Sequence, residues 1–188
     1  RFWHFLTREM LPAIERDYPE TRGGQRLMAG FSLGGYTVSL LASQCPGYFD
    51  HAGIYDGTFM WPGHNDPRQQ QTGTWSDRIW CKAPIFDAAL GLPRKADAMR
   101  RWNSTDAISM AQHTLLDQLR RTTFYVSCAA SDGMKGNRDR ATFFVDLLRK
   151  KDIPLASEKI IFAIDAAHTW HWADLFLTRF LTTALAAP

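Results

Sequence analysis

The chain has 188 residues, of which 45% are hydrophobic and 22% charged, and this suits one globular domain with a sizeable apolar core. Its net charge of +3 is mild and its basic residues are scattered, which argues against a nucleic acid as partner. No apolar run approaches the ~20 residues of a membrane-spanning helix, so we expect a soluble protein, either cytoplasmic or exported. Three scattered cysteines without a CxxC pair signal no zinc site, and we expect neither a metal nor a cofactor.

The first third of the chain predicts helix, strand, helix and strand in succession. Apolar residues recur at helical spacing from Phe2 to Tyr18. Residues 26–30 form a short apolar run that predicts a buried strand, and residues 34–43 predict a helix that ends before Pro46. Residues 51–55 predict the next strand. A strand, a tight turn and a helix therefore follow one another around residue 32.

The remainder begins with a segment of a different kind. Residues 56–106 are rich in Trp, Gly, Pro and Gln with weak periodicity, which predicts a loop-rich cap or insertion that faces the substrate. Beyond it, the sequence predicts a strand over 122–129, a helix over 138–150, a strand over 159–164 and a last helix over 170–185. Repeated alternation of strands and helices predicts an α/β fold with three layers, α/β/α, whose mostly parallel sheet binds ligands at the carboxyl ends of its strands.

A serine stands in the tight turn between the predicted strand and helix. The segment from Gly30 to Gly35 fits the G-x-S-x-G pattern of a nucleophile elbow, with Ser32 at its centre. A sharp turn of this kind holds the hydroxyl out at the edge of the sheet, and glycines on either side let the strand and the helix approach closely. We interpret Ser32 as a catalytic nucleophile, with the Leu33 backbone N–H as one oxyanion donor.

A serine nucleophile needs a base, and the position of the histidines favours one of the six. In folds with a nucleophile elbow, the histidine follows the last strand of the sheet. His168 lies just beyond the predicted strand 159–164 and is our candidate base. His171, three residues further on, is its main competitor.

The acid of such a triad follows a strand that lies between the serine and the histidine in sequence. The predicted strand 122–129 leads into Asp132, which we predict as the carboxylate that orients the imidazole. Asp139 and Asp165 are the alternatives. The three predicted catalytic residues are therefore Ser32, Asp132 and His168.

With these residues located, the chain resembles the putative esterase family of α/β-hydrolases, which includes esterase D, S-formylglutathione hydrolase, enterochelin esterases, feruloyl esterases and mycolyltransferases. Leu11-Pro12 with Ile14 matches the helix that precedes the elbow in this family. The run 128–132, Cys-Ala-Ala-Ser-Asp, matches the acid turn with Ala129 in place of a glycine. The run 166–172, which ends in His-Thr-Trp-His-Trp, matches the segment around the catalytic histidine.

The resemblance also implies what would precede this chain. Family members have several strands before the helix that corresponds to Phe2–Tyr18, and the loop after the third of them supplies the second oxyanion amide. We therefore expect this chain to hold about half of the sheet and only the first donor, Leu33. A nucleophile strand without its outer neighbour has an unpaired edge, so a homo-oligomer is a possible state of the chain.

The resemblance and the triad together predict a serine esterase that acts on a small-molecule carboxylic ester or thioester through an acyl-enzyme. Two alternatives stay open, namely an acyltransferase of the mycolyltransferase type and a non-catalytic fragment that acts as a binding module. For substrate contacts we name Trp170, next to the histidine, and Trp61 and Trp75 in the predicted cap. The sequence does not identify the substrate.

Overall fold

The structure is a computed structural model, and it describes residues 2–59, 61, 116–131, 136–157 and 159–186. The predicted cap over 56–106 therefore lies outside the described residues except for 56–59 and Trp61. Trp75, one of the predicted substrate contacts, is also outside them.

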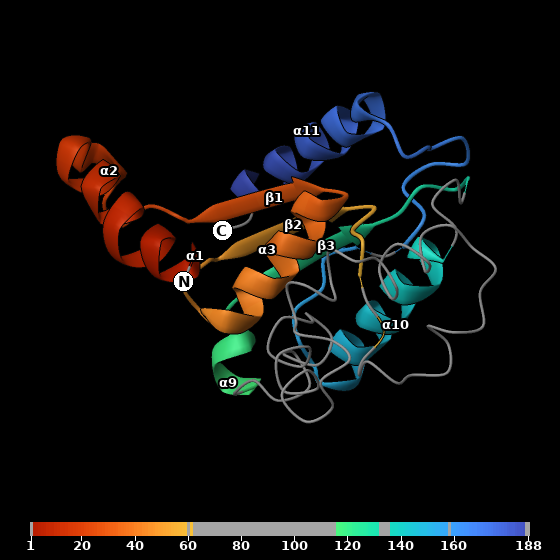
Figure 1. Cartoon of the computed structure of the whole chain (residues 1–188), viewed down its shortest axis with the longest axis horizontal. Helices are drawn as coiled ribbons and strands as arrows, with labels where there is room; N and C mark the ends of the chain where they lie inside the picture. Colours follow the sequence, from red (N-terminus) through yellow and green to blue (C-terminus); the bar gives the residue numbers. More distant parts are fainter. Residues whose placement is uncertain (1, 60, 62–115, 132–135, 158, 187–188) are drawn as a thin grey trace, which may run out of the picture.

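Three parallel strands form the sheet of the described residues. They are β1 (Leu27–Phe31), β2 (His51–Tyr55) and β3 (Thr123–Ser127), in the order β1-β2-β3. In register, Gly30 pairs with Ile54, and Ile54 pairs with Val126. Because β2 is the middle strand and helices cover both faces, every one of its residues is buried. The carboxyl ends of all three strands lie at one edge of the sheet (Figure 1).

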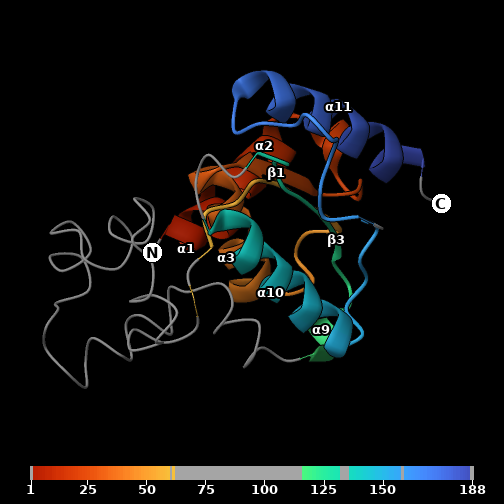
Figure 2. The ribbon, with the colours of Figure 1, turned by 90° about the vertical axis from the view of Figure 1, so that its right-hand side faces the viewer.

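Helices cover both faces of this sheet, so the predicted three-layer α/β fold is confirmed. On one face lie α3 (Leu33–Gln44) and α10 (Asn137–Lys150), and on the other lies α11 (Trp170–Ala186), as the two views show (Figures 1 and 2). The first face buries Val38, Ile54 and Phe144 in one apolar cluster. The second buries aromatic side chains of α11 against Tyr55. A short helix, α9 (Leu116–Leu119), precedes β3.

The predicted strand over 159–164 is wrong as a regular strand. Two isolated parallel bridges, Phe124 to Leu155 and Cys128 to Ile161, are all that pairs this part of the described chain with β3. Between them the Ser157 hydroxyl accepts the Val126 N–H at 2.8 Å, in the place where a neighbouring strand would offer a backbone carbonyl. At Ser157 a side chain therefore takes the place of a backbone partner.

The predicted helix from Phe2 to Tyr18 is observed in three parts. They are α1 (Phe2–Phe5), a π-helical turn η1 (Leu6–Met10) and α2 (Leu11–Asp17), followed by a 3₁₀ turn, η2 (Pro19–Thr21). This arm extends away from the sheet and contains no buried residue (Figure 1). Its contacts with the body include an ion pair of 2.6 Å between Glu15 and Arg26.

The two glycines that flank the elbow are under different steric constraints, which gives a first prediction. A Cβ on Gly30 would lie 2.3 Å from the backbone carbonyl atoms of Gly34, whereas a Cβ on Gly34 would meet nothing within 4 Å. Gly30→Ala is therefore expected to lower the free energy of unfolding by about 3 kcal/mol or more. Gly34→Ala should leave it unchanged or raise it by up to about 1 kcal/mol, because alanine favours a helix.

Urea unfolding of the two variants beside the parent chain measures this difference. Equal midpoints for Gly30→Ala and the parent would show that the strand and helix can separate at the elbow at no cost.

Candidate active site

Ser32 lies at the junction of β1 and α3 in strained backbone geometry. Its φ is 55° and its ψ is −120°, a region that side-chain-bearing residues rarely adopt. The surroundings hold this conformation, because the Ser32 N–H donates to Tyr55 O at 3.1 Å and Ser32 O accepts from the amides of Tyr36 and Thr58. The Ser32 side chain makes no capping hydrogen bond to the helix. Its hydroxyl is thus not used to begin the helix, although serine often has that role.

The helix that follows Ser32 directs free amides toward the serine. The first intrahelical hydrogen bond of α3 runs from Tyr36 N to Ser32 O at 3.1 Å. The Leu33 amide precedes that bond and belongs to the first turn, whose N–H groups have no partner within the helix. The Leu33 N–H is therefore placed where an oxyanion next to Ser32 could accept a hydrogen bond.

His168 lies in the loop that leads into α11, and neighbouring segments fix this loop on both sides. Ala166 O accepts from the amides of Ala130 and Ser131, at 2.8 Å and 3.2 Å. On the other side, the Tyr55 hydroxyl donates to Ala167 O at 2.8 Å. The loop is thereby tied to the carboxyl ends of both β2 and β3.

A buried carboxylate holds the imidazole. His168 Nδ1 lies 2.5 Å from Asp56 Oδ2, and the two side chains are 19% and 4% exposed. Asp56 directly follows β2 and has a φ of 45°, and its N–H donates to Ser127 O at 2.7 Å. A carboxylate beside Nδ1 favours the tautomer of His168 that has its proton on Nδ1. The lone pair of Nε2 is then available to accept a proton.

In the described structure the carboxylate beside His168 Nδ1 is that of Asp56, whereas the sequence predicts Asp132, which stays a prediction. Asp132 lies outside the described residues, directly after Ser131, whose amide contacts the His168 loop. The alternatives Asp139 and Asp165 are both exposed. The sequence pattern favours an acid after a later strand, and so it does not single out Asp56. Its position directly after the strand 51–55 is the signal that could have found it.

The histidine alternative is placed elsewhere. His171 lies in the first turn of α11, is exposed, and has Trp172 as a ring neighbour at 5.4 Å. It does not line the cleft that contains Ser32 and His168. Of the two candidate histidines, the structure brings His168 to the serine.

An open cleft contains Ser32 and His168 together. Its remaining walls are residues of β1, the start of α3 and the loop before α11, namely Ala29, Gly30, Phe31, Leu33, Gly34, Thr169 and Trp170. The Phe31 ring contacts the rings of both His168 and Trp170. Its centroid lies 4.6 Å from that of His168 and 5.1 Å from that of Trp170. Among the hydrogen bonds of the described residues, none joins Ser32 Oγ to His168 Nε2. Such bonds are often long in unliganded enzymes and tighten with substrate.

The predicted substrate contacts differ in their placement. Trp170 lines the cleft and is 74% exposed. Trp61 is buried against Phe143 of α10, with ring centroids 5.6 Å apart, and does not line the cleft. Trp61 therefore packs the core in this structure.

In the described parts of the chain, no group of three or more His, Cys, Asp and Glu side chains could hold a metal ion. None of the helices in those parts has both the length and the apolar character to cross a membrane.

The Tyr55 hydroxyl is the link between β2 and the His168 loop, and its loss gives a second prediction. Tyr55→Phe leaves the partly buried Ala167 carbonyl without its donor, which should cost about 1 kcal/mol of stability. Because His168 is the next residue, we expect kcat to fall about fivefold to tenfold with little change in KM. Tyr125→Phe is the matched control, since its hydroxyl has only a 3.4 Å contact with His51. Equal losses in both variants, measured with p-nitrophenyl butyrate, would contradict the prediction.

These features are those of the α/β-hydrolase fold. It has a parallel sheet between helix layers, a strained serine between a strand and a helix, and a histidine in the loop before the helix that follows. Comparison with known proteins agrees with this fold. Residues 1–182 match the family described as Putative esterase, and the chain belongs to that family. No curated protein matches the chain.

Solved structures with this fold are similar to the chain at low identity. A ferulic acid esterase has 18% identity and a TM-score of 0.62, and the match covers 98% of this chain and 61% of that protein. An S-formylglutathione hydrolase from Agrobacterium tumefaciens has 20% identity and a TM-score of 0.64, covering 98% and 56%. MPT51 of Mycobacterium tuberculosis has 18% identity and a TM-score of 0.60, covering 100% and 69%. The chain thus spans 56% to 69% of the length of these three proteins.

Proposed function

We propose that the chain provides the catalytic residues of a serine esterase that cleaves a small-molecule carboxylic ester. The observation that carries the proposal is the strained Ser32, with φ of 55°, in one cleft with His168, whose Nδ1 lies 2.5 Å from the buried Asp56. Strain of this kind persists where the surrounding structure imposes it, and it is concentrated at functional sites. Membership of the esterase family and the names of two of the similar structures support the same reaction.

The reaction follows from the positions of these groups. Ser32 Oγ attacks the acyl carbon of the ester while its proton passes to His168 Nε2. The tetrahedral intermediate collapses as the C–O bond to the leaving alcohol breaks, and the imidazolium returns the proton to that alcohol. Water then attacks the acyl-enzyme with the same base, which releases the carboxylic acid and restores Ser32. Asp56 stabilises the imidazolium that forms in each half of the cycle.

Within the chain, the Leu33 N–H is our assignment for the first oxyanion donor. Each such donor contributes on the order of 10²-fold to 10³-fold in turnover.

The exposed ring of Trp170 and the ring of Phe31 form an aromatic wall at one side of the cleft. We assign to this wall the apolar part of the substrate. Trp75 stays a prediction for the same role.

Labelling with a fluorophosphonate tests the proposal directly, because such reagents phosphonylate a serine only when a base activates it. We expect the parent chain to gain one label, located on the peptide that contains Ser32 by mass spectrometry. The His168→Ala variant should react far more slowly. Labelling of a different residue, or equal labelling of the denatured chain, would rule out Ser32 as an activated nucleophile.

A further inference from the structure

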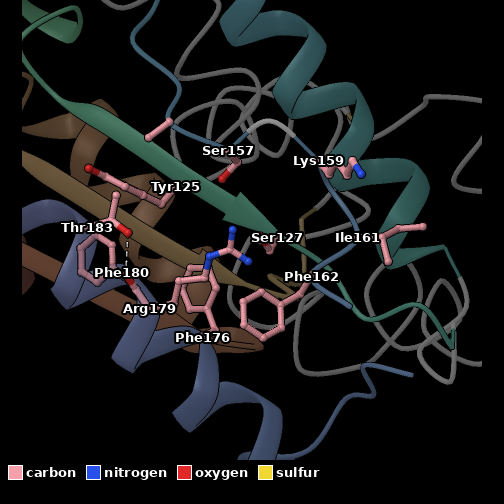
Figure 3. A pocket seen from close by; sticks show the side chains of 11 residues that line it. Tyr125, Ser127, Ser157, Lys159, Ile161, Phe162, Phe176, Arg179, Phe180 and Thr183 are labelled. Carbon is pink, nitrogen blue, oxygen red and sulfur yellow. Dashed lines mark hydrogen bonds between the residues drawn. The ribbon is translucent and has the colours of Figure 1, made fainter. Parts of the chain in front are cut away.

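A second cavity, of about 460 Å³, lies on the α11 side of the sheet beside β3, and we call it the β3 cavity (Figure 3). Residues of β3 and α11 and of the segment 156–162 between them line it, among them Tyr125, Ser127, Ser157 and Arg179. Its size is within the range of pockets that bind small molecules.

The cavity lies where regular pairing with β3 is interrupted. Phe124 and Cys128 pair with Leu155 and Ile161 through isolated bridges, with hydrogen bonds from the Ala156 N–H to Phe124 O and from the Cys128 N–H to Ile160 O. Between these bridges, Ser157 contacts β3 through its side chain, whose hydroxyl accepts the Val126 N–H.

The polar groups that line the β3 cavity are cationic or can donate hydrogen bonds. They are the guanidinium of Arg179, the ammonium of Lys159 and the hydroxyls of Ser127, Ser157, Thr183 and Tyr125. Neither Arg179 nor Lys159 forms an ion pair with another of the described residues. Figure 3 shows the Arg179 side chain extending from α11 toward the end of β3 at Ser127. This lining favours an anion.

The apolar part of the lining is aromatic. Phe162, Phe176 and Phe180 contribute rings, and Phe162 and Phe176 lie with their centroids 5.8 Å apart. The Arg179 guanidinium lies 5.8 Å from the Phe162 ring centroid, so the positive charge is held beside the aromatic surface. An aromatic ring could pack there while a charged substituent reaches Arg179.

The β3 cavity and the catalytic cleft are separate. They have no lining residue in common among the described residues. The buried Tyr55 lies between them, since its ring packs against Phe162 and Phe176, while its hydroxyl binds the loop that carries His168. A ligand in the β3 cavity would therefore contact Phe162 and Phe176, which pack against Tyr55, and not the reacting atoms.

We propose that the β3 cavity is a binding site for a small aromatic monocarboxylate. Its carboxylate pairs with Arg179 and Lys159 and accepts from the Ser127 hydroxyl, and its ring packs on Phe162 and Phe176. Binding at this site does not require catalysis by Ser32, so the proposal stands apart from the proposed esterase activity.

Titration of the ¹⁵N-labelled chain with benzoate, followed by amide NMR, tests the site. We expect shifts at Ser127, Ser157, Arg179 and Thr183, with a dissociation constant of roughly 1 mM. Benzamide, which has the same shape without the charge, should bind at least about tenfold more weakly. Sodium acetate should also bind more weakly, because it lacks the ring.

Two variants test whether benzoate binding depends on the charge of Arg179. Arg179→Gln should weaken benzoate binding about tenfold or more, whereas Arg149→Gln, which removes an equal charge from the surface of α10, should not. A well-dispersed spectrum of each variant shows that it is folded. Shifts centred on Leu33 and Trp170, equal binding of benzamide, unchanged binding by Arg179→Gln, or no shifts up to about 20 mM benzoate would each overturn the proposal.

Discussion

Replacing Ser32 by alanine is expected to lower the turnover of an activated ester by about 10⁴-fold to 10⁶-fold, because the hydroxyl is the atom that forms the acyl-enzyme. Thermal stability should stay nearly unchanged. The Ser32 side chain makes no hydrogen bond to the helix, so its removal leaves no backbone amide without a partner. Steady-state hydrolysis of p-nitrophenyl butyrate and a melting curve measure the two effects on the same samples.

The matched control is Ser43→Ala on the same helix. Its hydroxyl is buried and donates to Ser39 O at 2.9 Å, so this variant should lose some stability and keep its activity. Ser32→Ala should thus lose activity and keep its stability, whereas Ser43→Ala should lose stability and keep its activity. Hydrolysis by Ser32→Ala at the parent rate, or hydrolysis by the parent chain no faster than background, would contradict the proposed mechanism.

Replacing Asp56 by asparagine is expected to lower kcat by about 10³-fold to 10⁴-fold with little change in KM. The amide has nearly the same shape as the carboxylate, but it can present an N–H to Nδ1 and so stabilise the wrong tautomer of His168. The neutral amide also cannot stabilise the imidazolium that forms during both proton transfers. Rates measured at saturating and at low substrate concentrations separate kcat from KM.

Asp132→Asn is the decisive comparison, since Asp132 is the acid that the sequence predicts. If Asp56 orients His168, Asp132→Asn should retain at least about a tenth of the parent kcat. Asp139→Asn, at an exposed position of α10, controls for the loss of one negative charge. A large loss in Asp132→Asn with a small loss in Asp56→Asn would assign the acid to Asp132 and make the contact of 2.5 Å in the structure a non-catalytic one.

Local patterns in the sequence predicted most of the helices and strands and the tight turn at Ser32. The elbow depends on adjacent residues: glycine at position 30 is required by the 2.3 Å approach to Gly34, and that requirement is visible as a motif. The bounds of β2, His51–Tyr55, match the predicted strand, and those of α11, Trp170–Ala186, differ from the prediction by one residue. Short-range periodicity is sufficient for a helix such as α11 because its own hydrogen bonds and one buried face determine it.

The expectations that differ from the structure depend on contacts between residues that are distant in sequence. Lys159–Ile164 has the composition of a strand, but Ser157 replaces the backbone partner of Val126 and only one bridge forms within that range. Trp61 is predicted as a substrate contact because it lies in the predicted cap, whereas in the structure it is buried against the ring of Phe143 on α10. Neither Ser157 nor Phe143 is near its partner in sequence, so neither pairing has a local signal.

The contact between Asp56 and His168 joins residues 112 positions apart, and this spacing affects how the chain folds. The Tyr55 hydroxyl and Ala167 O close a loop of the same length. Such a closure has an entropic cost that grows with the logarithm of loop length, and parallel strands such as β2 and β3 can pair only after the long segment between them has been brought back. During synthesis, the elbow is complete well before residue 168 leaves the ribosome. In the proposed mechanism, Ser32 is therefore in place before its base, so the onset of ester hydrolysis would report the docking of α11.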